Sequence, residues 1–277
     1  MTTVVFVDTE TTRLDDDGEV WEIGAIVREP DHPDVRHRYL VRPQRMHRAD
    51  PEALAIGRFH ERTDHITEVL RGAVANLAEP GVPEAWSCPA TLAALLEGMF
   101  DGAVLTASNA PFDHRKLALF LTRFECELNA HYRPVDSGGV SWGYLHGRAA
   151  AGRVTPQQRA VLARGLPWSS TDVAAALGVH RQNVHEALPD AEFVRDVHDL
   201  VTGWTPAFSV GTPAVRLDDF PLIRDDLIRA TLDLLTVTYA EPRIGDEEDG
   251  RYADERLIDA ARRLVAAADA RPNRGGA

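Results

Sequence analysis

Four acidic residues and one histidine stand in sequence contexts that suit hard cations and phosphate chemistry. They are Asp8, Glu10, Asp113, His185 and Asp190. Carboxylates brought to one place repel each other unless cations hold them, and Mg²⁺ and Mn²⁺ prefer such oxygen ligands. If the fold gathers these side chains, the natural interpretation is a divalent-metal site that serves phosphate chemistry.

Asp8 and Glu10 directly follow the apolar run 4–7, which is typical of a central strand. Because side chains two positions apart on a strand point to the same side, both carboxylates project together. On its own, an Asp-x-Glu pair also matches a strand that is followed by a polar turn. The hydroxyls of Thr11 and Thr12, which come next, suit a phosphate or sugar contact.

The other three residues stand at the starts of expected helices. Asp113 follows the apolar run 103–105, and it could equally be a helix-initiating residue favoured by the helix dipole. His185 and Asp190 lie in a loop that enters a helix, where the pair could also be a surface histidine and an N-capping aspartate. No paired-cysteine or His-Glu-x-x-His spacing supports zinc.

The elements that must position these residues alternate as in a mixed α/β domain. The expected strands are 4–7, 20–27, 38–41, 104–107 and 132–136. The expected helices run from Pro51 through Phe59, Thr91 through Phe100, Phe112 to Phe124, over 170–177, and from about Asp190 to Val201. Short separations favour antiparallel pairing of the first three strands. The pattern predicts a five-stranded mixed sheet, three antiparallel strands and then parallel additions, flanked by helices.

A boundary is expected at Gly203-Trp-Thr-Pro206. Beyond it, apolar stripes over 222–235 and 257–265 predict a helical hairpin. The predicted organisation is therefore a catalytic domain over 1–203 and a helical C-terminal extension over 204–277. The extension could pack back on the domain, mediate self-association, or bind a polymerase or another partner.

The composition excludes some classes of function. The chain has 277 residues with 44% hydrophobic, enough to bury a full core. A net charge of −13 argues against a passive nucleic-acid coat, which needs a broad basic face, but not against a nuclease. Cys88 and Cys126 lack Cys-x-x-Cys spacing, and neither a secretory signal nor a membrane-span-length apolar stretch is visible. We therefore expect a soluble, cytoplasmic protein with no membrane contact.

In order and context, the motifs resemble the DnaQ-like 3′–5′ exonucleases of the ribonuclease H-like superfamily, a family with four acidic residues and a histidine. The resemblance covers roughly residues 3–202, with the first motif at 8–10, the second at 109–113 and the third at 185–190. The histidine in the third motif points to the histidine (DEDDh) branch. Arg13 stands where the family commonly has glycine, which leaves the geometry of that turn open.

The resemblance implies a metal-dependent exonuclease that releases nucleoside monophosphates from single-stranded or frayed 3′ ends of DNA. It assigns two Mg²⁺ or Mn²⁺ ions to Asp8, Glu10, Asp113 and Asp190, with Asp8 shared. His185 would be the general base, which must be neutral, and the reference pKa of histidine is about 6.5. Substrate contacts near the terminal nucleotide are expected from Thr9, Thr11, Thr12, Asn109 and Phe112.

Two alternatives stay open at this point. RNA 3′–5′ exonucleases such as oligoribonucleases share all five residues, so the sugar preference is not decided. A catalytically idle scaffold that binds a polymerase or clamp through the extension belongs to another class, although a scaffold has no need to hold repelling carboxylates together. Phe112 could equally be a core residue.

Overall fold

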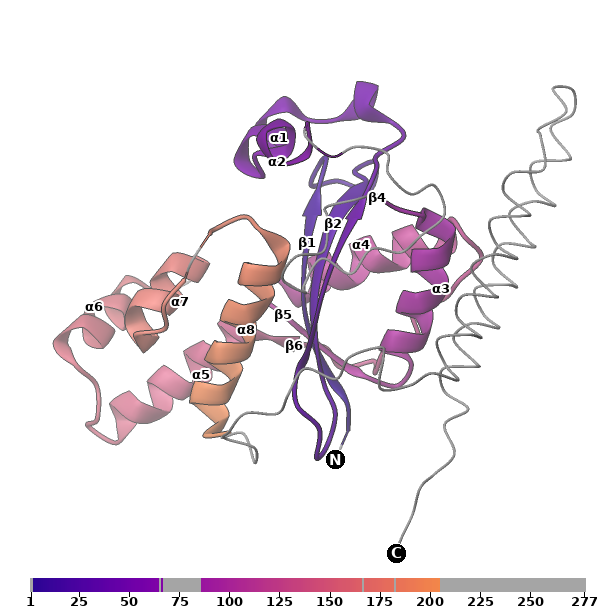
Figure 1. Ribbon diagram of the computed structural model, residues 1–277. Coiled ribbons are helices and arrows are strands. Elements are labelled where there is room, and N and C mark those ends of the chain that lie inside the picture. Colours follow the sequence, from indigo (N-terminus) through magenta and orange to yellow (C-terminus); the bar gives the residue numbers. More distant parts are fainter. Residues whose placement is uncertain (1, 65, 67–85, 166, 182, 205–277) are drawn as a thin grey trace, which may run out of the picture.

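The structure is a computed structural model that describes residues 2–64, 66, 86–165, 167–181 and 183–204. Figure 1 shows a central twisted sheet with helices on both faces. The predicted helical extension lies outside the described residues, apart from Trp204. No helix in the described part of the chain is long and apolar enough to cross a membrane.

Over the described residues the sheet has six strands, in the order β4-β3-β2-β1-β5-β6. The strands are β1 (Val4–Thr11), β2 (Val20–Arg28), β3 (Val35–Val41), β4 (Trp86–Ser87), β5 (Val104–Ala107) and β6 (Val135–Asp136). β2 pairs antiparallel with β1 and β3, whereas β1–β5, β5–β6 and β3–β4 are parallel. This confirms the predicted fold class. The strand beyond the expected five is β4, whose two residues are too few to show a pattern.

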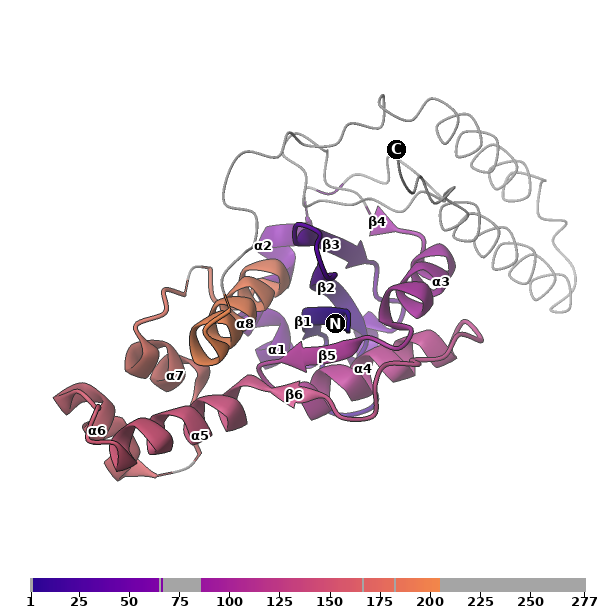
Figure 2. The same cartoon turned by 90° about the horizontal axis from the view of Figure 1, so that it is seen from below.

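The helices divide between the two faces of the sheet. In chain order they are η1 (Met46–Arg48), α1 (Pro51–Ile56), α2 (Phe59–Thr63), α3 (Pro89–Phe100), α4 (Ala110–Thr122), α5 (Ser137–Ala150), α6 (Pro156–Arg164), α7 (Ser170–Leu177) and α8 (Ala187–Thr202). Helices α3 and α4 cover one face, and α8 covers the other with α5, α6 and α7 beyond it (Figures 1 and 2). Helices α1 and α2 lie at the end of the sheet away from the N-terminus (Figure 1).

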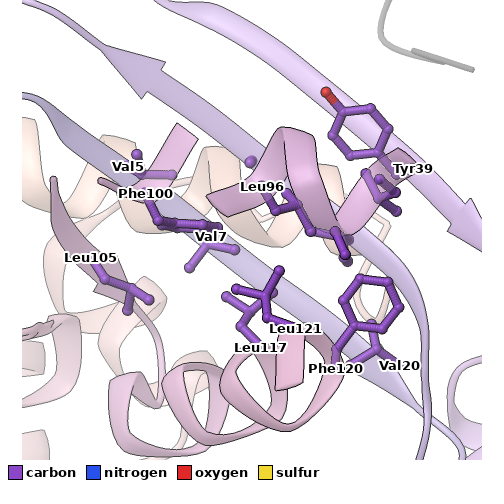
Figure 3. Packing of buried hydrophobic residues seen from close by; sticks show 14 of the residues in the cluster. Val5, Val7, Val20, Tyr39, Leu96, Phe100, Leu105, Leu117, Phe120 and Leu121 are labelled. Carbon is purple, nitrogen blue, oxygen red and sulfur yellow. The ribbon is translucent and has the colours of Figure 1, made fainter. Parts of the chain in front are cut away.

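The alternation of side chains along β1 divides the core between the two faces. Val5 and Val7 pack in the cluster that α3 and α4 form with the sheet (Figure 3), whereas Phe6 packs in the cluster of α8. Because the side-chain period of a strand is two, Asp8 and Glu10 share the face of Phe6. Their carboxylates therefore project toward α8.

The entry to α1 follows the sequence signals, but the expected single helix is divided. Asp50 caps α1 by accepting a hydrogen bond from the backbone N–H of Glu52 at 2.9 Å, with Pro51 in the first helical position. The helix ends at Gly57, and Arg58 adopts a left-handed φ of 51° before α2 begins. The break redirects α2, so its arginine side chains can reach elements beyond α1.

Glycines follow the ends of two helices, α7 where the sequence predicts it and α8 at the expected domain boundary. Gly178 follows α7 with a φ of 71°, and Gly203 follows α8 with a φ of 69°. The start of α8 differs from the expectation, since the helix begins at Ala187 and not near Asp190. Asp190 consequently lies inside the first turn, buried, where it cannot be the N-cap.

Candidate metal centre

One edge of the sheet gathers the acidic residues. Strands β1, β5 and β6 run parallel, so their carboxyl ends meet at this edge, which is where ligand sites form in such sheets. β1 brings Asp8 and Glu10 to it, β5 leads into the helix that carries Asp113, and β6 ends at Asp136. The strand order therefore brings together residues that are far apart in the sequence.

β1 is longer than its apolar run predicts. The strand continues through Thr11, so Asp8 and Glu10 lie on the strand itself and not in the turn after it. The register against β2 shifts between Glu10 and Thr11, as at a β-bulge. Bulges often lie beside functional sites because they redirect a side chain and end the regular pairing.

Asp113 reaches β1 from the first turns of α4. Its Oδ1 accepts hydrogen bonds from the backbone N–H of Thr9 at 3.0 Å and from the Thr9 hydroxyl at 2.8 Å. Asp113 is buried, with 3% of its surface exposed. Thr9 thus holds the carboxylate of Asp113, and these hydrogen bonds join α4 to the acidic end of β1.

His185 and Asp190 reach the same edge from the start of α8. One ligand atom each of Glu10, His185 and Asp190 lie within 4.8 Å of one another, a spacing at which one cation could bind all three. The Asp190 carboxylate accepts a hydrogen bond from the backbone N–H of His185 at 3.0 Å. His185 is exposed and has a left-handed φ of 66°. The third motif therefore converges on the first, as its sequence context led us to expect.

A glycine on β2 allows this convergence. Gly24 pairs with Asp8 across the β1–β2 ladder, and a Cβ at Gly24 would lie 2.2 Å from the carbonyl carbon of Ala187. The first turn of α8 therefore lies directly on the strand backbone beside Asp8. Sequence reasoning did not single out Gly24, although a glycine inside an apolar strand signals a close backbone approach.

Burial and mutual repulsion raise the pKa of the site carboxyl groups. Burial is the largest cause for Asp8, whose pKa the charges of Asp113, Glu10 and Asp190 raise further, to well above its ordinary value. Burial raises the pKa of Glu10 to about 7, with repulsion from Glu22 and Asp190 adding to it. Burial likewise raises the pKa of Asp113 to about 7 and raises that of Asp190. Such oxygen donors fit a hard divalent cation, whose charge would offset the repulsion.

Glu22 is a further carboxylate at the site, which sequence reasoning missed. It is fully buried on β2 opposite Glu10. Its Oε1 accepts a hydrogen bond from Nε of Arg38 at 2.6 Å, and Oε2 forms an ion pair with Arg62 of α2. Because two guanidinium groups neutralise it, Glu22 supports the site and is not needed as a ligand. An acidic residue inside an apolar strand was the available signal.

Arg181 provides a positive charge at Asp190. Its guanidinium lies 2.9 Å from the Asp190 carboxylate and also donates to the Ser170 hydroxyl at 2.6 Å. Only 13% of the Arg181 side chain is exposed. The ion pair lowers the pKa of Asp190, against the larger effect of burial. Sequence reasoning gave no role to Arg181.

The predicted threonine contacts are buried and bonded within the protein. Besides the contact of Thr9 with the second motif, the Thr11 hydroxyl donates to the carbonyl of Arg13 at 2.8 Å. The Thr12 hydroxyl accepts from the backbone N–H of Glu19 at 2.9 Å. Contacts of these threonines with a substrate stay predictions. The hydrogen bonds show that they also shape the end of β1.

Asn109 and Phe112 are more exposed to solvent than the three threonines. Asn109 is exposed at the N-cap position of α4, and Phe112 is half-buried. The ammonium of Lys116 lies 5.3 Å from the centre of the Phe112 ring. Phe112 is thus not a fully buried core residue, and the substrate contacts of both residues stay predictions.

The turn after the first motif needs no glycine at Arg13, because Arg13 is not among the residues with a positive φ. Its carbonyl accepts a hydrogen bond from Nζ of Lys116 at 2.9 Å, and its guanidinium forms an ion pair with Asp15. The close approach is made by Gly18, where a Cβ would lie 2.2 Å from the Arg13 carbonyl oxygen. Contact between the loop and α4 therefore sets this turn.

Known structures are similar to this chain in fold. A structure of exonuclease I aligns with a TM-score of 0.51 and 15% sequence identity, over 73% of this chain and 41% of that chain. Exonuclease I of E. coli in complex with a dA16 oligonucleotide aligns with a TM-score of 0.42 and 15% identity, over 85% of this chain and 46% of that chain. No protein-family model and no curated protein matches the sequence. The chain spans less than half the length of these exonucleases, and its fold is similar to that of exonuclease I.

Proposed function

We propose that this protein is a metal-dependent 3′–5′ exonuclease that releases nucleoside monophosphates from single-stranded or frayed 3′ ends of DNA. One observation carries the proposal: at one edge of an exonuclease I-like fold, ligand atoms of Glu10, His185 and Asp190 lie within 4.8 Å of one another, and the charges of Asp113, Glu10 and Asp190 act on Asp8. The proposed site comprises Asp8, Glu10, Asp113, His185 and Asp190. A protein without catalytic activity would gain nothing from holding these repelling carboxylates together.

Asp8, Glu10, Asp113 and Asp190 would hold two Mg²⁺ or Mn²⁺ ions, with Asp8 shared between them. When bound, such a pair supplies Lewis acidity and charge neutralisation at a scissile phosphate. The protein's own contribution is to present the oxygen donors from a strand and two helix starts, which are rigid elements. The raised pKa values of Glu10 and Asp113 support this assignment, because they report negative charge crowded into a poorly solvated place.

His185 would act as the general base that takes the proton of the attacking water. Its ring is exposed, and a ring nitrogen lies within 4.8 Å of carboxylate oxygens of Glu10 and Asp190. Its peptide N–H is anchored on Asp190, so the ring stays beside the acidic cluster. A general base must be unprotonated to accept a proton, so hydrolysis should require the neutral imidazole.

The strand end is the expected substrate because the chemistry reads a terminal phosphodiester and not a base sequence. Thr9, Thr11, Thr12, Asn109 and Phe112 are the proposed contacts to the terminal nucleotide. The five central residues do not distinguish deoxyribose from ribose, so a single-stranded RNA end is the second candidate substrate.

We propose that the catalytic domain ends near residue 203, because α8 ends at Thr202 and Gly203 turns the chain. The extension over 204–277 remains proposed as a segment for self-association or for binding a polymerase, and the cytoplasm remains the expected location.

The proposal is tested by digestion of substrates that carry a label at either the 3′ or the 5′ end. The substrates are matched single-stranded DNA and RNA, duplex DNA and mismatched duplex DNA. With Mg²⁺, a 3′ label on single-stranded DNA should leave as a mononucleotide in the first turnovers, while a 5′ label should shorten stepwise. Chelation with EDTA should stop both. Early release of a 5′-labelled mononucleotide, or equal digestion in EDTA, would contradict the proposal. Faster digestion of RNA would instead select the second candidate substrate.

A further inference from the structure

The peptide groups on both sides of His185 are held by charged side chains. Its N–H donates to Oδ2 of Asp190 at 3.0 Å, and its carbonyl accepts from Nη1 of Arg62 at 3.0 Å. The residue between these two anchors has a left-handed φ of 66°, which is unfavourable for a residue with a Cβ. Such a conformation persists only when the surroundings over-determine it.

Arg62 is itself fixed by buried partners. Only 9% of its side chain is exposed, and its second terminal nitrogen forms an ion pair with the fully buried Glu22. Its guanidinium carbon lies 4.9 Å from the centre of the Trp21 ring. Because these contacts immobilise the guanidinium, Arg62 can hold the carbonyl of His185 in one place.

Glu22 completes the connection from the other side. The oxygen that pairs with Arg62 also lies 3.3 Å from the backbone N–H of Ala187, which donates to it. Residues 185 and 187 are thus tied to one buried pair that joins β2 and α2. Arg58 adds an outer contact, 2.5 Å from Glu186, but 45% of its side chain is exposed and solvent screens the pair.

We propose that Arg62, supported by Glu22, is a positioning residue that holds the strained peptide of His185 and keeps the imidazole at the Glu10–Asp190 pair. The effect of Arg62 on kcat rests on the proposed function, whereas its effect on the backbone around His185 does not. Helix α2 lies at the same end of the sheet as the acidic edge, which agrees with this arrangement (Figure 1). Direct phosphate binding by Arg62 is disfavoured because its guanidinium is buried and already engaged by Glu22 and by two carbonyls.

The test combines kinetics with amide hydrogen exchange in full-length protein. Arg62→Met should lower kcat by about 10- to 100-fold, since small misplacements of a catalytic group have effects of this size, while KM changes less than about threefold. Made together with His185→Ala, it should lower kcat by no more than about twofold further, because the group it positions is gone. Amides of residues 183–187 should exchange faster in Arg62→Met. Arg164→Met, which removes the exposed ion pair with Asp172, is the matched control and should change neither readout.

An equal fall in kcat in the His185→Ala background, or an effect mainly on KM, would overturn positioning in favour of a direct role of Arg62. Unchanged exchange of residues 183–187 would also overturn it. If Arg62→Met fails to fold, Arg62→Lys tests the proposal instead. Lysine keeps the positive charge facing Glu22 but lacks the planar guanidinium that bonds Glu22 and the His185 carbonyl together, so kcat and the exchange rates should be intermediate. A wild-type protein without nuclease activity would refute the proposed function, while the exchange measurement would still judge the positioning role.

Discussion

At the scale of single residues, the site carboxyl groups are held against their electrostatic preference. Burial and negative neighbours raise the pKa of Asp8 and Glu10, so the folded protein is less stable when these groups ionise. Residues kept for catalysis often lower stability in this way. Neutralising one of them should therefore separate function from stability.

Asp8→Asn should lower the rate of DNA hydrolysis by about two orders of magnitude or more, because metal-held charge supplies several kcal/mol at the transition state. The same variant should raise the melting temperature of the metal-free protein at pH 8 by a few degrees, as expected for about 1 kcal/mol. Thermal melts in EDTA measure the second effect. Asp196→Asn, which alters the ion pair with Arg195, is the control and should change neither the hydrolysis rate nor the melting temperature. Full activity of Asp8→Asn would remove Asp8 from the site.

His185→Ala should lower kcat by about 10²- to 10⁴-fold, the usual contribution of a general base, with little change in the affinity for single-stranded DNA. The Mg²⁺ concentration for half-maximal activity should stay the same. Steady-state kinetics across Mg²⁺ concentrations measure both quantities. A large rise in that concentration would mean that His185 is a metal ligand, a role that its spacing from Glu10 and Asp190 also permits.

The sequence indicated residues that could do chemistry, but it did not indicate the residues that support them. Asp8 and Asp190 stand in motifs whose order is informative, and the structure brings both to the same edge. The roles of Glu22 and Arg62 could not be predicted, because each depends on a partner from another element. Buried charge becomes interpretable only when its counter-charge is known.

At the scale of elements, local signals predicted the kind of each element and tertiary contacts set its ends. Pro51 and Gly178 start and end their helices as expected. β1 runs on to Thr11 because β2 pairs with it there, and α8 begins at Ala187 because that turn packs on β2. Neither extension follows from the apolar pattern of its own segment.

Gly24→Ala tests the contact between β2 and α8. A Cβ there would lie 2.2 Å from the backbone of Ala187, so α8 must move away and take Asp190 with it. We expect a loss of about 1–3 kcal/mol of unfolding free energy, as for overpacking, together with a large loss of activity. Chemical denaturation and kinetic assays measure the two effects.

Gly143→Ala is the matched control, since a Cβ at this position on α5 would meet no atom within 4 Å. It should leave activity unchanged and stabilise the protein by up to about 1 kcal/mol, because alanine favours a helix. Equal behaviour of the two variants would show that the close approach at Gly24 does not position the site.

At the scale of the whole molecule, the net charge of −13 and the acidic edge make stability depend on pH and on cations. The folded protein holds protons on Glu10 and Asp113 up to about pH 7, whereas an unfolded carboxyl group releases them near pH 4 to 4.5. Their contribution to stability is therefore lost as the pH rises through this window. His37 has the opposite effect on the pH dependence of stability. Burial lowers its pKa to about 4, so its contribution favours the folded state more as the pH rises.

The difference between metal-free and Mg²⁺-saturated protein isolates the acidic edge, because the effect of His37 cancels. We expect stabilisation by Mg²⁺ to be small near pH 4.5 and to grow steadily to pH 8, as protons cease to compete with the cation. Melting temperatures in EDTA and in Mg²⁺ across this range measure it. A difference independent of pH, or one that shrinks as pH rises, would contradict a cation site at these carboxylates.

The mixed sheet could be predicted, because the hydrophobic period and the short separations of the first three strands are visible in the sequence. The strand order that brings the motifs to one edge was not predicted. The two-residue β4 and the division of the Pro51–Phe59 segment into α1 and α2 could not be predicted. They depend on pairing with β3 and on the left-handed Arg58. The predicted hairpin over 222–265 lies outside the described residues.

In the proposed mechanism, side chains from β1, α4 and the start of α8 form one centre for paired divalent cations. Anomalous diffraction from crystals of the protein soaked in Mn²⁺ tests it most directly. We expect two peaks about 3.5–4 Å apart, both bound by Asp8 and flanked by Glu10, Asp113 and Asp190. No peak at these carboxylates at millimolar Mn²⁺, or peaks that leave Asp8 without a cation, would contradict it.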